Sequence, residues 1–416
     1  MRGIARLWQG VLLWGLFRLC RHISIGQLTI VLPDGSQHQF KGSTPGPHAQ
    51  FTIKDRSAVG DIMRSGALGF CEAYMDGKLD SPNVMAVIEL AARQGKTFHH
   101  DRLNTNWWRR WMLHISHWRA RNRQKQAEVN IAQHYDRGNQ FYQLWLDPSL
   151  TYSSAYFTPL AGSPKTRGDN QPSLEWGQRN KYARIAELAG IGKTSRVLEI
   201  GCGWGGFAEY AAKRHGCKVT AITISKQQHA YTRARIKNAG LAGQIEVVFM
   251  DYRDCPRRFG QRFDSVVSIE MIEAVGAEYW GVYFASIAQC LKPHGRAVLQ
   301  AITIDHALYQ NYRHQPDFIQ RYIFPGGVLP SLPALDVPIK QAKLALRVSA
   351  GFGLDYAATL AEWRRRFQQK EAAVAGLGFD AKFRRMWELY LAYCEGGFRA
   401  GTIDVKHLIL SHAPVT

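Results

Sequence analysis

Several patterns are missing from this sequence of 416 residues. No run of about 20 consecutive apolar residues occurs, so no segment is expected to span a bilayer as a helix. The seven cysteines are scattered and include no C-x-x-C pair, which argues against a disulfide framework and a zinc site and favours a reducing cytosol. No internal repeat or long low-complexity tract is visible. The chain is therefore expected to be globular, and its length predicts two domains.

Acidic residues are scarce relative to basic ones, with 33 Asp and Glu against 53 Lys and Arg and a formal net charge of +20. An excess of this size implies an anionic partner, either nucleic acid or an anionic lipid surface. The segment 101–128 interleaves tryptophan with arginine and lysine, a pattern that suits a membrane interface. A linker helix that packs its tryptophans on the main domain is an equally good interpretation.

The first residues form an apolar stretch, Leu7–Phe17, preceded by Arg2 and Arg6. A signal peptide can begin in this way, but Arg18 and Arg21 follow directly and no small-x-small cleavage site is visible. We therefore expect an amphipathic helix that lies at a membrane interface, with plain core packing as the alternative.

Residues 1–100 are predicted to form a small α+β domain that associates with lipid or membrane. Residues 27–32 and 49–53 have the composition of strands, and 66–75 has the composition of a helix. Nothing in this domain looks catalytic, and the segment 101–128 is interpreted as a linker to the rest of the chain.

From residue 129 to 416, strands and helices alternate in the order of a doubly wound, mostly parallel α/β sheet. The predicted strands are 196–200, 218–224, 245–250, 263–269 and 295–304, with helices such as 226–239 and 279–290 between them. Ligands of such sheets bind outside the carboxyl ends of the strands. Four residues fall at or just after such ends: Gly201, Thr223, Asp251 and Glu273.

The strand 196–200 runs into a glycine-rich turn, G-C-G-W-G-G, and then a helix at 207–214. Gly201 and Gly203 allow the backbone to approach a ligand, and the helix start offers free N–H groups. The spacing differs from the dinucleotide pattern G-x-G-x-x-G, and Glu199 would repel a pyrophosphate but suits a cationic amino group. This favours S-adenosylmethionine (SAM) over NAD, with a generic glycine-rich turn as the alternative.

Later strand ends extend the predicted cofactor site. Thr223 is placed to cap the helix at 226–239, and Gln228 can hydrogen-bond a ribose hydroxyl. Asp251 is placed to accept a hydrogen bond from an adenine amino group, with Tyr252 stacked beside the ring. For Thr223 and Asp251, helix capping without a ligand is the alternative interpretation.

Two further stretches carry chemistry. Glu270 and Glu273 follow the strand 263–269, and a carboxylate there could work as a base or hold one; the alternative is a pair favoured by a helix N-terminus. Polar and aromatic residues alternate over 134–142 and 147–157, which suits a lid over a small-molecule pocket or an ordinary helix and loop.

Five ordered motifs together resemble the cyclopropane-fatty-acyl-phospholipid synthases, of which the mycolic acid cyclopropane synthases look like shorter relatives. The motifs are Tyr152-Ser153, the glycine turn at 201–206, Asp251-Tyr252-Arg253, 324–331 and 352–356. The resemblance implies a Rossmann-like SAM-dependent methyltransferase domain. It also implies that a cis double bond of a phospholipid acyl chain attacks the methyl group of SAM. A base then removes a proton from the new methyl group and closes a cyclopropane ring.

In that family the base is a bicarbonate ion. The positions that hold it are, in this chain, Ser154 where the family has Cys, Glu273, Gln300 where the family has His, the amide beside Ile302, and Tyr356. The resemblance also matches SAM-contact positions to Tyr152, Ser153, Gly201, Gly203, Gln228, Asp251 and Tyr252. Gln300 cannot supply the positive charge of a protonated His, so bicarbonate binding is expected to weaken. If the base is lost, the carbocation could instead lose a proton from a neighbouring carbon, leaving a methyl-branched, unsaturated chain.

We therefore predict a cyclopropane-fatty-acyl-phospholipid synthase-like SAM-dependent methyltransferase, cytoplasmic and peripheral on the inner face of the membrane. The phospholipid surface is the expected partner, no nucleic acid is expected, and a homodimer is left open. A C-methyltransferase that makes methyl-branched unsaturated chains is the first alternative. An RNA methyltransferase and a non-catalytic lipid-binding protein are the others.

Overall fold

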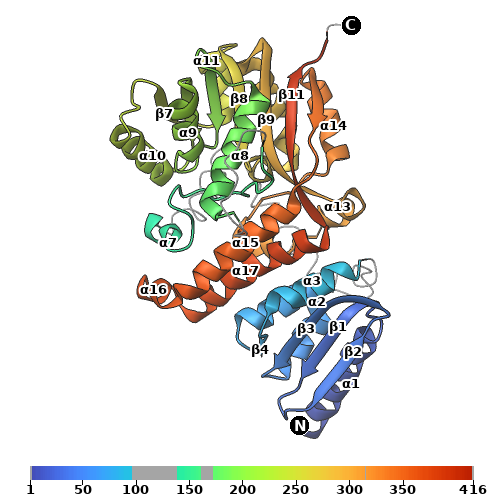
Figure 1. Cartoon of the computed structure of the whole chain (residues 1–416). Coiled ribbons are helices and arrows are strands. Elements are labelled where there is room, and N and C mark those ends of the chain that lie inside the picture. The colour runs from blue at the N-terminus through green and yellow to red at the C-terminus, as the bar shows by residue number, and fades with distance from the viewer. Residues whose placement is uncertain (1, 96–137, 161–171, 314, 415–416) are drawn as a thin grey trace. The chain divides into compact units, whose positions relative to one another are not determined.

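The computed structural model describes residues 2–95, 138–160, 172–313 and 315–414 (Figure 1). The described residues separate into two compact units. The first unit holds those up to residue 95 together with 315–321 and 360–402, and the second holds the remainder. The domain boundaries predicted at residues 100 and 128, and the tryptophan-rich linker between them, lie outside the described residues and remain predictions.

The first unit contains a four-stranded sheet in the order β2-β1-β3-β4. Its strands are β1 (Ile25–Val31), β2 (Gln37–Lys41), β3 (Thr44–Ile53) and β4 (Leu79–Asp80). Its helices are α1 (Arg2–Cys20), α2 (Ser57–Met75), α3 (Val84–Arg93), α16 (Glu371–Gly376) and α17 (Ala381–Ala400). The small α+β fold predicted from the sequence is confirmed, although β2, β4 and α3 were missed.

Helix α2 begins nine residues before the helix predicted at 66–75. Gly66 interrupts it with φ 57° and ψ −132°, a conformation open to glycine and costly for other residues. The sequence therefore indicated the second half of α2, after the interruption, and missed the first half. α17 packs against both α2 and α3, so two distant parts of the chain build this unit.

Helix α1 has two contrasting faces. Leu16 and Cys20 are buried, whereas Val11 and Trp14 are 60% and 59% exposed. The guanidinium of Arg18 lies 5.5 Å from the centre of the Trp14 ring. The predicted helix is thus present and buries part of its surface, as the core-packing alternative expected, while its position at a membrane interface remains a prediction. Among the described residues, no helix is long and apolar enough to cross a membrane.

The second unit is built on a seven-stranded sheet in the order β10-β11-β9-β8-β5-β6-β7 (Figure 1). Its strands are β5 (Arg196–Ile200), β6 (Lys218–Thr223), β7 (Ile245–Phe249), β8 (Phe263–Ile269), β9 (Leu291–Ile304), β10 (Leu344–Val348) and β11 (Ile403–His412). The strands from β7 to β9 pair in parallel, and β11 pairs antiparallel with β9 and β10. The predicted doubly wound, Rossmann-like α/β fold is confirmed, with β10 and β11 as the strands the sequence missed.

Helices connect these strands. They are α7 (Asn139–Gln143), α8 (Leu174–Ala189), α9 (Gly206–His215), α10 (Lys226–Asn238), α11 (Cys255–Phe259), α12 (Trp280–Cys290), α13 (His306–Tyr312), α14 (Leu332–Gln341) and the first part of α15 (Gly353–Gln369), whose residues from 360 onward belong to the first unit. Short helical turns are η1 (Tyr252–Asp254), η2 (Ile272–Ala274), η3 (Ala277–Tyr279) and the π-helical η4 (Ile319–Ile323). The helices predicted at 226–239 and 279–290 agree with α10 and α12 to within one residue at each end.

The central strands are buried on both faces. Leu198 of β5 and Val266 of β8 enter one core cluster, and their neighbours Val197 and Val267 enter another. Adjacent residues of a strand point to opposite faces, so both faces of the sheet are covered and the strands read as continuous apolar runs. What remains open to a ligand is the edge formed by the carboxyl ends of the strands.

Candidate active site

Glu270 follows β8 directly and has an unusual backbone conformation. Its φ of 50° lies in the left-handed region, which non-glycine residues rarely adopt. Its carboxylate accepts hydrogen bonds from the backbone N–H of Ser154 (2.8 Å) and the side-chain amide of Gln300 (2.7 Å), both at Oε1. The hydroxyl of Tyr356 donates to Oε2 at 2.7 Å. Three of the positions predicted to hold a bicarbonate ion therefore converge on a carboxylate of the chain itself.

Glu273 occupies a different environment one turn further on. Its Oε1 accepts from the backbone N–H of Ile302 at 2.5 Å, while its Oε2 is buried without a hydrogen-bond partner among the described residues. Burial, followed by the charge of Glu270, raises the pKa of Glu273 to about 8. Glu273 is therefore mainly protonated at neutral pH, and its neutral form can donate a proton or a hydrogen bond.

The two carboxyl groups differ in how their charge is stabilised. Burial raises the pKa of Glu270, but the charge of Lys181 opposes that rise, as do the hydrogen bonds from Gln300, Ser154 and Tyr356. Two neighbouring buried carboxyl groups resist simultaneous ionisation. The better-stabilised anion is Glu270, which makes it the stronger candidate for a general base.

Ser154 contributes to this cluster through its backbone and not through its side chain. The Ser154 hydroxyl donates to the carbonyl oxygen of Ala155 at 2.8 Å. The Ser154 position was predicted to hold an anion, and the donor that reaches the Glu270 carboxylate from this position is the Ser154 amide. A short side chain that satisfies itself on the next carbonyl is a common property of serine, and it removes the hydroxyl from the anion cluster.

Lys181 and His407 were not singled out from the sequence. Lys181 of α8 is fully buried, and its Nζ donates to the Ser153 hydroxyl at 2.7 Å. His407 of β11 is also buried, and its Nε2 lies 3.2 Å from Oε1 of Gln300. A lysine in a helix and a histidine in a strand carry no distinguishing spacing, so no sequence signal marked either residue.

The glycine turn after β5 has the predicted geometry. Gly201 and Gly203 have φ of 81° and 53°, and the N–H of Gly201 donates to the carbonyl of Ile222 in β6. A side chain at Gly203 would meet nothing within 4 Å, so open space lies over the turn. Oε2 of Glu199 is buried without a hydrogen-bond partner among the described residues, and burial raises the pKa of this carboxyl well above its usual value. A buried carboxyl oxygen without a partner in the described part of the chain, beside an open glycine turn, fits the ammonium group of SAM.

The predicted helix cap at Thr223 is wrong. The residue that caps α10 is Ser225, whose hydroxyl accepts from the N–H of Gln228 at 3.2 Å. The Thr223 hydroxyl accepts instead from the N–H of Ser225 and donates to Oε1 of Gln228. Thr223 lies at the last position of β6, two residues too early to face the first turn of the helix. Its hydrogen bond nevertheless fixes the amide predicted to reach a ribose hydroxyl.

Asp251 lies two residues after β7 and caps η1 by accepting from the N–H of Arg253. Its two carboxylate oxygens also accept from the Arg253 guanidinium at 2.8 and 2.9 Å. The Tyr252 ring is buried and packs edge-on against Tyr283 at 5.2 Å. The capping interpretation of Asp251 therefore applies, and the adenine contacts of Asp251 and Tyr252 remain predictions.

Tyr152 and Ser153, which were predicted to contact SAM, directly precede the Ser154 amide that donates to Glu270. Tyr152 packs against Tyr142 and Trp145 at 5.5 Å, and Ser153 follows it. Residues 134–137 of the predicted lid lie outside the described residues.

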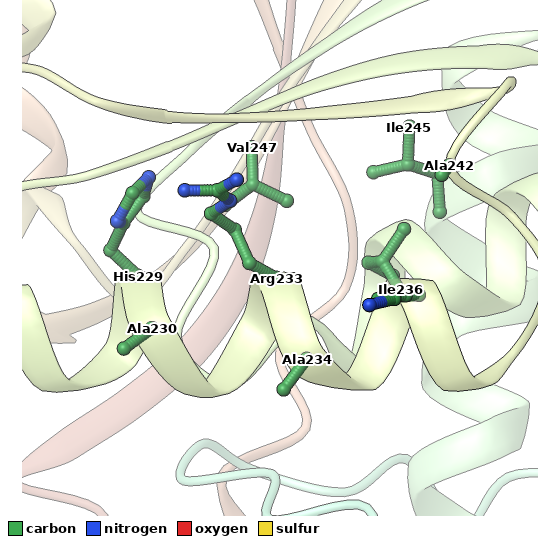
Figure 2. Close-up of a pocket in the computed structure, with 9 residues that line it drawn as sticks. His229, Ala230, Arg233, Ala234, Ile236, Ala242, Ile245 and Val247 are labelled. Atoms are coloured by element: carbon green, nitrogen blue, oxygen red, sulfur yellow. The ribbon is translucent and has the colours of Figure 1, made fainter.

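A separate groove between α10 and β7, with a volume of roughly 510 Å³, contains none of the predicted site residues. Figure 2 shows His229 and Arg233 rising from the same side of α10 in this groove. It therefore plays no part in the site at the carboxyl ends of β5 and β8.

Comparisons with known proteins agree on one family. A family model described as mycolic acid cyclopropane synthetase matches residues 122–408, and a model for a domain of unknown function matches residues 18–102. The tuberculostearic acid methyltransferase UfaA1 of Mycobacterium tuberculosis is 41% identical over 384 residues, covering 91% of this chain and 86% of the relative. The cyclopropane-fatty-acyl-phospholipid synthase of Escherichia coli K12 is 31% identical, covering 89% of each chain.

A solved structure supports the same fold. The mycolic acid cyclopropane synthase CmaA1, in complex with SAH and CTAB, is 27% identical with a TM-score of 0.60. The match covers 68% of this chain and 97% of that structure.

Proposed function

The chain belongs to the mycolic acid cyclopropane synthetase family, and from that premise we propose that it makes methyl-branched, unsaturated acyl chains in phospholipids. It is a SAM-dependent enzyme of fatty acid modification. The relative at 41% identity is named for tuberculostearic acid, a methyl-branched acid, whereas the relative named a cyclopropane synthase is 31% identical. The methyl-branched product, an alternative in the sequence analysis, therefore has more support than cyclopropanation.

The observation that carries this proposal is the position of the Glu270 carboxylate. It accepts hydrogen bonds from Ser154, Gln300 and Tyr356, three positions predicted to hold bicarbonate. A bicarbonate ion bound to the same donors would be repelled by the Glu270 carboxylate. The donors would also already be hydrogen-bonded to Glu270. Glu270 thus takes the role of the base, and the reaction proceeds without bicarbonate.

The residues of the methyl-donor site have separate tasks. Glu199 would hold the ammonium group of SAM, and Gly201 and Gly203 would allow its close approach to the backbone. SAM supplies an electrophilic methyl group on a sulfonium. The electron pair of the olefin forms the new C–C bond as the C–S bond breaks, which leaves a positive charge on the second olefinic carbon.

Glu270 then completes the reaction. Its carboxylate takes a proton from a carbon next to the positive charge, and the C–H electron pair forms a new double bond. Tyr356 and Gln300 keep the carboxylate fixed through this transfer, because each donates to it within hydrogen-bond distance. The products are a methyl-branched, unsaturated chain and SAH, with one proton left on Glu270.

The substrate is taken from an anionic phospholipid surface. The net charge of +20 favours such a surface over a neutral one. Exposed Val11 and Trp14 on α1, with Arg18 beside the Trp14 ring, are the side-chain types that lie at a lipid interface. Binding of the chain to the membrane surface is therefore part of this proposal.

To test this, purified protein is incubated with methyl-labelled SAM and vesicles of unsaturated anionic phospholipid, with and without removal of dissolved bicarbonate, and label in the acyl chains is measured. Labelled acyl chains are expected in both conditions. Mild catalytic hydrogenation distinguishes the isomeric products, because a methyl-branched alkene takes up hydrogen and a cyclopropane resists it. Labelled chains that resist hydrogenation and disappear without bicarbonate would overturn the proposal.

A further inference from the structure

We propose that Lys181 is a positioning residue that keeps Glu270 anionic and fixes the backbone donor of Ser154 against it. This inference rests on the proposed function, since it assumes that Glu270 is the base. It assigns a role to a residue of α8 that does not itself touch the reacting carbons.

Lys181 is an ammonium group without access to water. Its side chain is fully buried, and its Nζ donates to the Ser153 hydroxyl at 2.7 Å and lies 5.0 Å from the centre of the Tyr182 ring. A buried cation is costly unless nearby anions or hydrogen bonds compensate for its lost hydration. An apolar side chain of similar size would avoid that cost, so packing alone gives no reason for a lysine here.

Carboxyl groups from three separate elements act on this ammonium group through their charge. Glu270 follows β8, Glu199 lies on β5, and Asp147 follows α7. Burial lowers the pKa of Lys181 to about 7, and these carboxylates oppose the fall. The attraction is mutual, so the positive charge of Lys181 favours the ionised form of Glu270.

The other titratable groups around Glu270 do not supply this charge. Burial lowers the pKa of His407 to about 3, so that its imidazole is neutral. Glu273 has a pKa raised to about 8 and adds negative charge if it ionises. Tyr356 donates a hydrogen bond as a neutral phenol.

Lys181 also acts through the backbone. Gln178 and Lys181 lie three residues apart on α8 and both bind Ser153: Gln178 donates to its carbonyl at 2.9 Å and Lys181 to its hydroxyl. The next N–H along the chain, that of Ser154, is the one that donates to Glu270. Through Gln178 and Lys181, helix α8 thereby influences both the charge of Glu270 and one of the hydrogen bonds that Glu270 accepts.

The test compares Lys181→Gln and Lys181→Met with Arg179→Gln, which removes an exposed charge from the same helix. The measurement is kcat/KM for acyl methylation against pH, with SAM affinity determined by calorimetry. Loss of the Lys181 charge should raise the pKa of Glu270. The acid limb of the pH–rate profile should then move to higher pH by about one unit or more, which lowers the rate about tenfold at pH values below the limb. Arg179→Gln should leave the limb in place.

A uniform fall in rate with an unmoved acid limb would overturn the proposal, because a structural role would act in that way. Lys181→Arg provides a second test if the other two variants do not fold. It retains the charge and should keep the wild-type limb, so a limb that moves in this folded variant would also contradict the proposal. The wild-type product reports separately on the proposed function: a cyclopropane or no methylation would contradict that function, whatever the variants do.

Discussion

Gln300 and His407 are directly opposed residues of β9 and β11, and their side chains meet with Oε1 of Gln300 3.2 Å from Nε2 of His407. The amide oxygen can only accept, so Nε2 of His407 carries the proton. This fixes the orientation of the Gln300 amide and turns its NH₂ group toward Glu270. His407 thus determines which end of Gln300 the carboxylate meets.

We expect His407→Phe to lower turnover and to change how stability depends on pH. His407 has a folded pKa of about 3, below the usual value of 6.5. Its contribution to stability is therefore present above about pH 6.5 and is lost as pH falls toward 3. Between these limits the free energy of unfolding of the wild type should fall by up to about 1.4 kcal/mol per pH unit from this group. Urea unfolding at pH 7 and pH 5 should show a shallower fall in His407→Phe, and an equally steep fall would count against this account.

Glu270→Gln should reduce methylation by at least about 100-fold, the usual contribution of a general base. Because Glu270 lies after β8 and not in the glycine turn, SAM affinity should change little. Added bicarbonate should not restore activity, since the amide still fills the space of the carboxylate. Calorimetry and a labelled-methyl assay measure the two effects, and near wild-type turnover would exclude Glu270 as the base.

The triple variant Glu270→Gly, Ser154→Cys and Gln300→His should gain a response to bicarbonate. Glycine adopts the φ of 50° at position 270 without strain and vacates the donors. A histidine at position 300 can add a positive charge for an anion. Product analysis with and without bicarbonate is the measurement, and the single variant Glu270→Gly is the control. A triple variant whose rate and products ignore bicarbonate would show that these positions do not form an anion site.

Glu273→Gln should retain most activity at pH 7 and lose the alkaline fall in rate. With a pKa of about 8, Glu273 is mainly neutral at pH 7, and glutamine resembles that form. In the wild type, ionisation of Glu273 above pH 8 sets a second negative charge beside Glu270 and should depress the rate. A pH profile of kcat measures this, and an inactive but folded Glu273→Gln variant would instead mean that Glu273 transfers a proton.

Glu199→Gln should weaken SAM binding by about tenfold or more, or about 1.4 kcal/mol. The ligand-free protein should be no less stable than the wild type, because the variant removes a buried carboxyl oxygen that has no hydrogen-bond partner among the described residues. Calorimetric titration and thermal unfolding check the two parts, with the exposed Glu187→Gln on α8 as the matched control. Unchanged SAM affinity would remove Glu199 from the cofactor site.

The parts of the fold that could be predicted are those with a local signal. β5 and β8 have the predicted bounds because both faces of each strand are buried, which produces an uninterrupted apolar run. β11 was missed because it joins the sheet beside β9, from nearly 100 residues further along the chain, and only this long-range pairing identifies it.

The sequence identified many residues of the candidate active site but not the contacts between them. The family resemblance selected Ser154, Gln300 and Tyr356, but the group that they bind is Glu270, which the sequence offered only as one of a pair. Ser154 and Glu270 are 116 positions apart, so no spacing rule could join them. Lys181 was hidden for a related reason: its burial depends on packing that the helix sequence does not reveal.

The left-handed backbone at Glu270 has a consequence for where such an enzyme can work. A side chain in this conformation costs about 1–2 kcal/mol relative to glycine, yet the chain carries glutamate there. If Glu270 is the base, as proposed, the proton acceptor is a permanent part of the polypeptide and not a solute taken from the medium. Membrane lipids made by this enzyme should have the same composition in cells starved of carbon dioxide as in cells growing under an ample supply.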